Sequence, residues 1–232
     1  MPVVTMTGTI ASGAREAGRR VANLLGIDFV DQQLLVQAAQ RCGVPVGAVA
    51  EHDERHASFR ERVASALTTI LERSAIGSGD PMTGAGGLET ILSQTYAEMA
   101  FEEESSISDQ LYFDTMTALI QELASSGRIV ILGRGGQMIL KDVPHALHAL
   151  CIAPAELRYE RLAERDGIDL HEAKHRGEDS DRARAAFYKK FWKVDVEDPR
   201  LYDLTIDTSH LSYDAAAEAI VAAARIKCGD CD

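Results

Sequence analysis

The sequence has no excess of basic residues, no long apolar run and no cysteine framework, and each absence excludes a class of protein. The formal net charge is −12, which argues against general nucleic-acid binding, because phosphate backbones require a basic surface. No run of about 18 apolar residues and no N-terminal leader pattern occurs, so we expect a cytoplasmic protein without a membrane partner. Four cysteines are too few for a disulfide framework in 232 residues. The terminal Cys228/Cys231 pair lacks the second pair that a zinc site requires.

Short β-prone runs separated by helical patterns predict an α/β fold. Hydrophobic residues make up 46% of the chain, enough to form the core of one large domain. The opening strand–loop–helix–strand pattern is typical of a parallel sheet. Five strands are expected in all, at residues 3–7, 27–30, 128–132, 149–153 and 204–207. We therefore predict a five-stranded parallel sheet flanked by helices.

A long segment after the second predicted strand has almost no strand signal. Residues 32–126 contain apolar residues at helical spacing, which predicts a helical insertion. The glycine-rich stretch at 77–87 lies inside this region and does not follow a strand, so it is expected to be a mobile loop. The apolar helix faces of the insertion also allow a homodimer.

The first loop, GTIASGAR, resembles part of a phosphate-binding loop. Gly8 and Gly13 have the G-x-x-x-x-G spacing of such loops, and the helix that follows offers unpaired N–H groups to a phosphate. The lysine and the hydroxyl residue that normally follow are replaced by Ala14 and Arg15, while Ser12 lies inside the loop. Arg15 could supply the missing cation or lie on the helix surface, and a glycine turn without a ligand stays possible.

Arginines from separate segments add a second signal. Arg134 stands between glycines directly after a buried strand. Arg158, Arg161 and Arg165 share one side of a predicted helix, which could be a phosphate-binding face or a solvated one. The final pair, Asp181 and Arg184, could bind a ligand or form a plain i, i+3 helix pair.

Several stretches, in this order, resemble the cytidylate kinase-like family, relatives of the P-loop nucleoside monophosphate kinases. They are TMTGTIASGAREAGRRVANLLG, DFVDQQLL, SDQLYFDTMTALIQELASSGRIVILGRGGQMIL, APAELRYERLAERDGI, DSDRARAAFYKKFW and YDLTIDTS. The resemblance implies one P-loop kinase-like domain over residues 1–232. Its expected parts are a core (1–31, 127–165 and 200–227), a helical acceptor-binding insertion (32–126) and a lid (166–195).

The same resemblance assigns roles to individual residues. It implies that ATP, with Mg²⁺, binds at Gly8, Thr9, Ala11, Ser12, Gly13, Ala14 and Arg15. The acceptor would contact Asp31, Arg134, Asp181 and Arg184. The catalytic cations would be Arg15, Arg134, Arg158 and Arg161, because phosphoryl transfer depends on positioning and cationic stabilisation.

Three departures from the family pattern weaken the assignment of activity. Ala14 replaces the loop lysine, Leu132 replaces a magnesium-binding aspartate, and the arginine expected soon after Asp31 is absent. No protein ligand for Mg²⁺ is therefore predicted. The expected function is ATP-dependent phosphoryl transfer to a nucleotide or a similar small acceptor. The alternatives are a nucleotide-binding or regulatory protein with weakened catalysis, and a kinase for a non-nucleotide metabolite.

Overall fold

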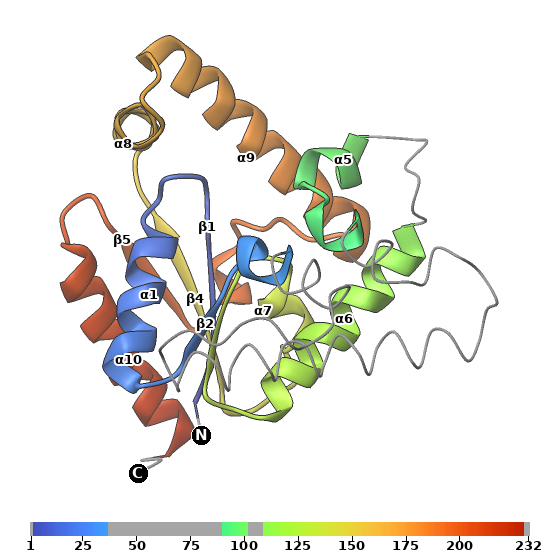
Figure 1. Ribbon diagram of the computed structural model, residues 1–232. Helices are drawn as coiled ribbons and strands as arrows, with labels where there is room; N and C mark the ends of the chain where they lie inside the picture. The colour runs from blue at the N-terminus through green and yellow to red at the C-terminus, as the bar shows by residue number, and fades with distance from the viewer. Residues whose placement is uncertain (1, 37–89, 102–108, 230–232) are drawn as a thin grey trace, which may run out of the picture.

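The computed structural model describes residues 2–36, 90–101 and 109–229, and within them five strands form one parallel sheet (Figure 1). The spatial order is β2-β3-β1-β4-β5, and every pairing is parallel. The predicted α/β fold class is therefore confirmed. The strands are β1 (Val3–Gly8), β2 (Asp28–Val30), β3 (Ile129–Leu132), β4 (Ala146–Ile152) and β5 (Leu204–Asp207).

Both faces of the sheet are buried at its centre, which explains why apolar residues stand next to each other in β1. Val3 and Val4 are adjacent in β1 and point to opposite faces, yet both are fully buried. Val3 belongs to one hydrophobic cluster with Leu119, and Val4 belongs to another with Ile220. The sheet thus separates two hydrophobic cores.

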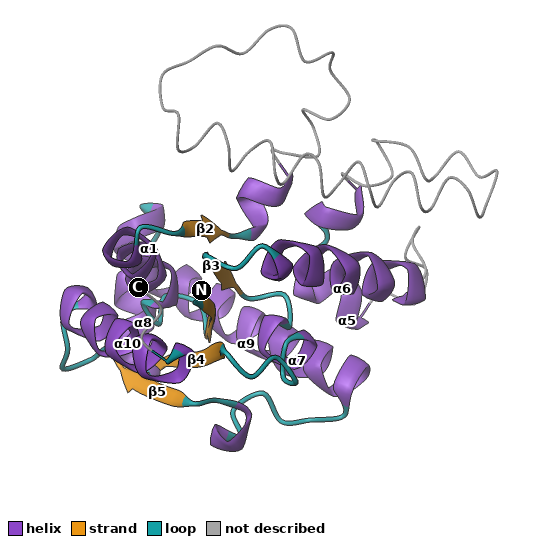
Figure 2. Ribbon diagram, turned by 90° about the horizontal axis from the view of Figure 1, so that it is seen from below, coloured by secondary structure: helices purple, strands orange, loops and turns teal. Residues whose placement is uncertain are grey.

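Two helices, α1 (Ala14–Leu25) and α10 (Tyr213–Cys228), cover one face of the sheet (Figure 2). Helix α1 ends at Gly26, which has a left-handed φ of 62°, as the C′ glycine pattern predicts. The hydroxyl of Ser212 accepts a hydrogen bond from the N–H of Ala215, so the predicted N-cap of the last helix is confirmed.

The opposite face is covered by α6 (Asp109–Ser125), α7 (Gly136–Ile139) and α9 (Leu170–Trp192) (Figure 2). The last turns of α9 bury Phe187 and Tyr188 against rings from the insertion, with Tyr96 4.8 Å from Phe187 between ring centroids. The four-residue helix α7 was not predicted, because the sequence GRGGQMIL contains no helical repeat long enough to detect.

The remaining helices are α5 (Tyr96–Phe101), α8 (Ala155–Asp166) and the 3₁₀ turn η2 (Pro199–Leu201). Helix α8 and the start of α9 lie above the carboxyl ends of the strands in Figure 1, while both chain termini lie at the other end of the sheet. Gly167 ends α8 with a left-handed φ, and the Asp169 carboxylate then caps α9 by accepting from the N–H of Glu172. This turn brings two helices over the first loop.

Strand β4 begins three residues before its predicted start at Ala149. His148 interrupts the apolar pattern, so no strand is predicted over these three residues. In the structure this imidazole is buried, and its Nδ1 lies 2.8 Å from the Thr5 hydroxyl of β1. Burial lowers the pKa of His148 and favours the neutral ring. A buried polar residue, hydrogen-bonded through Nδ1, therefore extends the strand.

Some predictions fall outside the described residues. These are the glycine-rich loop at 77–87, most of the helical insertion that would bind the acceptor, and Cys231 of the terminal pair. The division into core, insertion and lid stays a prediction. Among the described helices, none has the length and apolar character needed to cross a bilayer.

Candidate functional site

The first loop joins the end of β1 to the start of α1 and is shaped by its two glycines. Gly13 has a φ of 85°, and a Cβ at this position would lie 2.5 Å from the Tyr213 ring. A Cβ on Gly8 would lie 2.6 Å from the Cys151 carbonyl oxygen and 2.2 Å from Ser12 Oγ. Only glycine fits either position without a shift of the neighbours. No side chain caps the N-terminus of α1, so its first N–H groups stay available to an anion.

A cavity of about 340 Å³ opens beside this loop. Every predicted ATP-binding residue lines it, together with Asp31 and Arg134 from distant segments of the chain. Residues that were not predicted as part of a site, including Glu16, Tyr96 and Arg165, also line it. The lining residues are Thr7, Gly8, Thr9, Ile10, Ala11, Ser12, Gly13, Ala14, Arg15, Glu16, Asp31, Gln32, Tyr96, Leu132, Gly133, Arg134 and Arg165.

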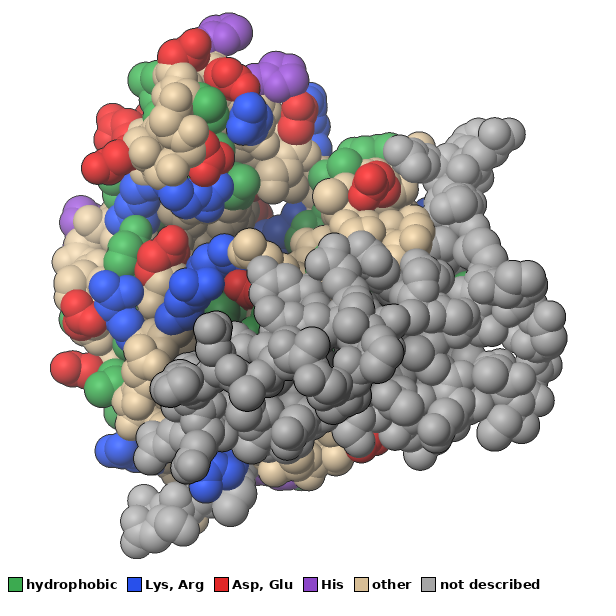
Figure 3. All heavy atoms as spheres, viewed as in Figure 1, with side chains coloured by type: hydrophobic (Ala, Val, Ile, Leu, Met, Phe, Trp, Pro, Cys, Tyr) green, Lys and Arg blue, Asp and Glu red, His purple; other side chains and the backbone are tan. Residues whose placement is uncertain are grey.

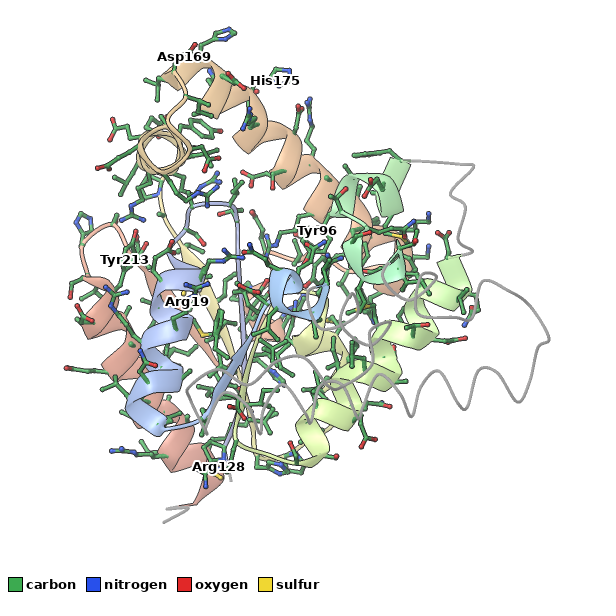
Figure 4. The ribbon with its side chains drawn as sticks, in the orientation of Figure 1. Arg19, Tyr96, Arg128, Asp169, His175 and Tyr213 are labelled. Carbon is green, nitrogen blue, oxygen red and sulfur yellow. The ribbon has the colours of Figure 1, made fainter. Side chains whose placement is uncertain are left out.

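Basic side chains gather around this part of a protein whose net charge is −12. Lys and Arg side chains cluster over the region of α1 and α8 in Figure 3, beside a hollow below α9. In Figure 4, Arg19 projects from α1, and Tyr96 lies beneath α9. The local charge of the cavity rim is therefore opposite to that of the whole chain, as an anion site requires.

Arg15 forms an ion pair across the cavity. Its Nη2 lies 2.9 Å from Oδ2 of Asp31, which is 5% exposed, and Arg19 approaches the same oxygen to 3.8 Å. The other carboxylate oxygen, Oδ1, accepts a hydrogen bond from the N–H of Leu34. The structure thus brings Arg15 and Asp31 together, with Asp31 as a counter-ion and as a local helix cap.

Helix α8 contributes two arginines that reach the back of the loop. Arg158 donates to the Ile10 carbonyl oxygen at 3.2 Å and to both carboxylate oxygens of Asp181 on α9. Arg161 contacts the Ala11 carbonyl oxygen at 3.5 Å and donates to both oxygens of Thr208. Neither arginine lines the cavity. They connect α8, α9 and the end of β5 to the loop.

Arg134 lines the cavity, yet most of its donors are used by the protein. Its Nη1 donates to the Gln94 carbonyl oxygen at 2.7 Å and to the Tyr112 hydroxyl at 2.9 Å, and its own N–H donates to the Tyr96 hydroxyl. Burial raises the pKa of Tyr112, which Arg134 opposes, so the hydroxyl stays neutral. Arg134 therefore connects β3 to the insertion in addition to any role toward a ligand.

Arg184 on α9 is a buried guanidinium without a carboxylate partner among the described residues. It is 4% exposed, its Nη2 contacts only the Thr7 hydroxyl at 3.4 Å, and its Nε has no acceptor. The ring of Tyr188 lies 5.8 Å from its guanidinium carbon. Burial raises the pKa of Tyr188, and that of Tyr202 to about 12, so neither hydroxyl supplies a negative charge.

Three buried polar atoms around the loop have no hydrogen-bond partner in the described structure. They are Ser12 Oγ, Arg158 Nε and Arg184 Nε. Ser12 belongs to the loop, Arg158 contacts Ile10 in it, and Arg184 contacts Thr7 directly before it. Buried donors are rarely left unpaired, because the lost hydrogen bonds to water are not recovered. Arg158 is already paired with Asp181, so Ser12 and Arg184 are the candidate contacts for an anion.

Sequence reasoning did not identify three of the cavity-lining side chains as site residues. No sequence pattern marks Tyr96 as a site residue, because its position beside the cavity depends on how the insertion folds against β3. Arg165 was recognised as part of the basic side of α8, but only the structure brings it to the cavity. Glu16 could have been predicted as a site residue, since it lies in the first turn of the helix that follows the glycine loop.

Comparison with known proteins identifies the family of the chain. The model of the cytidylate kinase-like family matches residues 3–210, so the chain belongs to this family. The cytidylate kinase of Methanopyrus kandleri is 35% identical over 111 residues, which are 44% of this chain and 58% of that enzyme. The cytidylate kinase of Archaeoglobus fulgidus is 24% identical over 224 residues, which are 97% of this chain and 95% of the relative. The M. kandleri match thus spans less than two thirds of that enzyme.

A solved structure shares the fold. An uncharacterized protein from Eubacterium ventriosum superposes with a TM-score of 0.60 at 15% sequence identity. The superposition covers 97% of this chain and 98% of the other. This similarity supports the fold alone.

Proposed function

We propose that the protein is an ATP-dependent phosphotransferase of the nucleoside monophosphate kinase class, acting on a nucleotide or a similar small acceptor. The observation that carries the proposal is the pair of unpartnered buried polar atoms at the first loop, Ser12 Oγ and Arg184 Nε. A phosphate would supply acceptors for such donors and a counter-charge for Arg184. Membership of the cytidylate kinase-like family supports the same activity.

The loop would bind the phosphates of ATP through backbone and side-chain donors together. The first N–H groups of α1 carry the positive end of the helix dipole, and Gly8 and Gly13 allow the backbone to approach closely. Arg184 would contact the bound phosphates from α9. Arg158 and Arg161 would fix α8 behind the loop through the carbonyl oxygens of Ile10 and Ala11.

The family implies ATP and Mg²⁺ as cofactors, and the cavity fits a polyphosphate. Its lining combines a glycine loop with Arg15, Arg134 and Arg165, and these cations would offset the negative charge that phosphoryl transfer spreads over oxygen atoms. Mg²⁺ bound to ATP would neutralise further charge on the phosphates. Helices α8 and α9, joined by the turn at Gly167, would exclude water from the reacting groups.

The proposal is tested by nucleotide binding and turnover in parallel. Calorimetry with ATP and Mg²⁺ measures occupancy of the loop, and a coupled assay with CMP, UMP, AMP, GMP and dCMP measures ADP release. We expect ATP to bind and at least one acceptor to stimulate ADP release well above hydrolysis without acceptor. A wild-type protein that binds neither ATP nor a non-hydrolysable analogue would refute the proposal.

A second candidate is a nucleotide-binding protein with weakened turnover, and the Arg15–Asp31 ion pair favours it. Ala14 removes the loop lysine, and the replacement cation is held by Asp31 at 2.9 Å. If Arg15 partly replaces the lysine, Arg15→Ala weakens ATP binding. An unchanged affinity would show that Arg15 acts only as a counter-ion for Asp31. Binding without turnover on the nucleotide panel would favour this second function.

The Asp31 carboxylate also affects which acceptor molecule can bind. Both oxygens of Asp31 already have protein partners, Leu34 N–H and Arg15, so a nucleoside would have to share this carboxylate with Arg15. This occupancy favours the third possibility, a kinase for a non-nucleotide metabolite. The nucleotide panel separates the two, because ATP binding without stimulation by any nucleotide would point to another acceptor.

A further inference from the structure

Glu16 is an acidic residue in a cavity otherwise lined by basic and neutral side chains, apart from Asp31. It lies in the first turn of α1, directly after the loop, and lines the cavity. Throughout the described ranges, no hydrogen bond or ion pair reaches its carboxylate, whereas Asp31 in the same cavity is paired with Arg15. Arg165, which lines the same cavity, directs its hydrogen bonds to Asp166. Among the described residues, Glu16 is therefore the cavity carboxylate that forms no ion pair.

This placement conflicts with a bound polyphosphate unless a cation lies between them. A carboxylate beside a phosphate group repels it. The acidic residue would then oppose the donors that the loop offers. A divalent cation removes the conflict, because carboxylate and phosphate oxygens can bind the same ion.

The donors present fit such an ion. Mg²⁺ prefers oxygen ligands and is usually held by one or two carboxylates together with substrate phosphates and water. Glu16 supplies a carboxylate, and the buried Ser12 hydroxyl in the same loop has no partner. Leu132, which also lines the cavity, has no oxygen in its side chain to offer. Glu16 thus supplies a carboxylate to the cavity in which Leu132 cannot supply one.

We propose that Glu16 binds the divalent cation carried by the triphosphate nucleotide. The inference rests on the proposed function, because the cation arrives with the nucleotide. It differs from a purely structural role, in which the Glu16 carboxylate only complements the positive end of the α1 dipole. The two roles predict different dependence of nucleotide affinity on metal.

The test compares Glu16→Gln with wild type by calorimetry, using a non-hydrolysable ATP analogue once with Mg²⁺ and once with EDTA. If Glu16 binds the cation, the substitution weakens metal-dependent binding while strengthening metal-free binding, because the repulsive charge is gone. We expect the factor by which Mg²⁺ improves affinity to fall about tenfold. Glu218→Gln, an exposed change on α10, is the matched control and should leave this factor unchanged.

Two further measurements keep the outcome decisive. Glu16→Asp retains the charge with a shorter side chain and should lie between wild type and Glu16→Gln. With Mn²⁺ in place of Mg²⁺, the electron paramagnetic resonance spectrum of the bound metal–analogue complex should change in Glu16→Gln and not in Glu218→Gln. A lower melting temperature with an unchanged metal factor would overturn the Glu16 site alone. No analogue binding by wild type would overturn the proposed function and this site together.

Discussion

The two glycine-containing loops that follow β1 and β3 are similar in sequence character and opposite in their hydrogen bonding. Both join a buried strand to a helix through residues with positive φ, Gly13 at 85° in the first loop and Gly133 at 75° in the second. At the second loop, groups of the protein accept the hydrogen bonds of Arg134. At the first loop, Ser12 Oγ and Nε of Arg184 on α9 have no hydrogen-bond partner among the described residues.

This difference shows what distinguishes a ligand site from a structural junction. Arg134 and Arg184 are almost equally buried, 5% and 4% exposed, so burial alone does not separate them. Arg134 has backbone carbonyl and tyrosine acceptors, whereas Arg184 has one long contact to a hydroxyl. A buried charge without a partner is costly in the absence of ligand. Arg184, which lacks acceptors, is therefore the arginine that we propose to bind an anion, whereas Arg134 joins the insertion to the sheet.

The largest expected effect is the loss of stability on Arg134→Ala. The substitution leaves the Gln94 carbonyl oxygen and the Tyr112 hydroxyl without their donor inside the protein. We expect the free energy of unfolding to fall by about 4 kcal/mol, measured by urea denaturation. Tyr96 would keep its bond from the Arg134 backbone N–H, which alanine retains.

The matched control is Arg128→Ala. Arg128 has nearly the same backbone conformation, φ 58° against 57° for Arg134, but its side chain is exposed and donates only to the Gly26 carbonyl oxygen. Its loss should cost less than about 1 kcal/mol. Equal losses for the two variants would mean that the left-handed backbone, and not the hydrogen-bond junction, determines the sensitivity.

A smaller effect is expected at the glycine that shapes the first loop. Gly13→Ala combines a left-handed φ with a Cβ 2.5 Å from the Tyr213 ring, so we expect a loss of about 3 kcal/mol and weaker ATP binding. Gly26→Ala has a φ of 62° and open space around the Cβ, so it should cost about 1 kcal/mol. Thermal unfolding of both variants measures the difference, and a similar melting temperature for both would contradict the role of the Tyr213 contact.

Much of the fold could be predicted from the sequence, because local patterns and burial agree there. The five strands are apolar runs between turn residues, and the glycine at position 26 and the serine at position 212 mark the helix ends where the structure has them. His148 shows the limit of this reasoning. A polar residue inside a strand gives no strand signal, and its hydrogen-bond partner, Thr5, is 143 residues away in the chain.

The site was less accessible to prediction. The glycine spacing located the cavity, but the sequence could not show that Arg134 is held by Tyr112 or that Arg15 pairs with Asp31. Both facts depend on contacts between segments separated by the insertion or by helix α1. Whether a buried arginine finds hydrogen-bond acceptors within the protein depends on tertiary packing, and the residue type alone does not reveal it.

The smallest expected effect on stability belongs to Arg184→Met. Methionine fills much of the same volume, and the change removes a buried charge that has no counter-ion in the described structure. We expect the free energy of unfolding to stay within about 1 kcal/mol of wild type, since replacing an unpaired buried charge by an apolar side chain is often neutral. Affinity for an ATP analogue should nevertheless fall about tenfold, because a charge-assisted hydrogen bond to phosphate is lost.

Arg182→Met is the control, because Arg182 is exposed on the same helix and pairs with Asp179. It should change neither stability nor affinity appreciably. If Arg184→Met instead lost several kcal/mol of stability with unchanged nucleotide affinity, Arg184 would be a structural residue like Arg134. The difference in hydrogen bonding between the two glycine-containing loops would then not mark a ligand site, because the buried guanidinium of Arg184 would be stable without an anion.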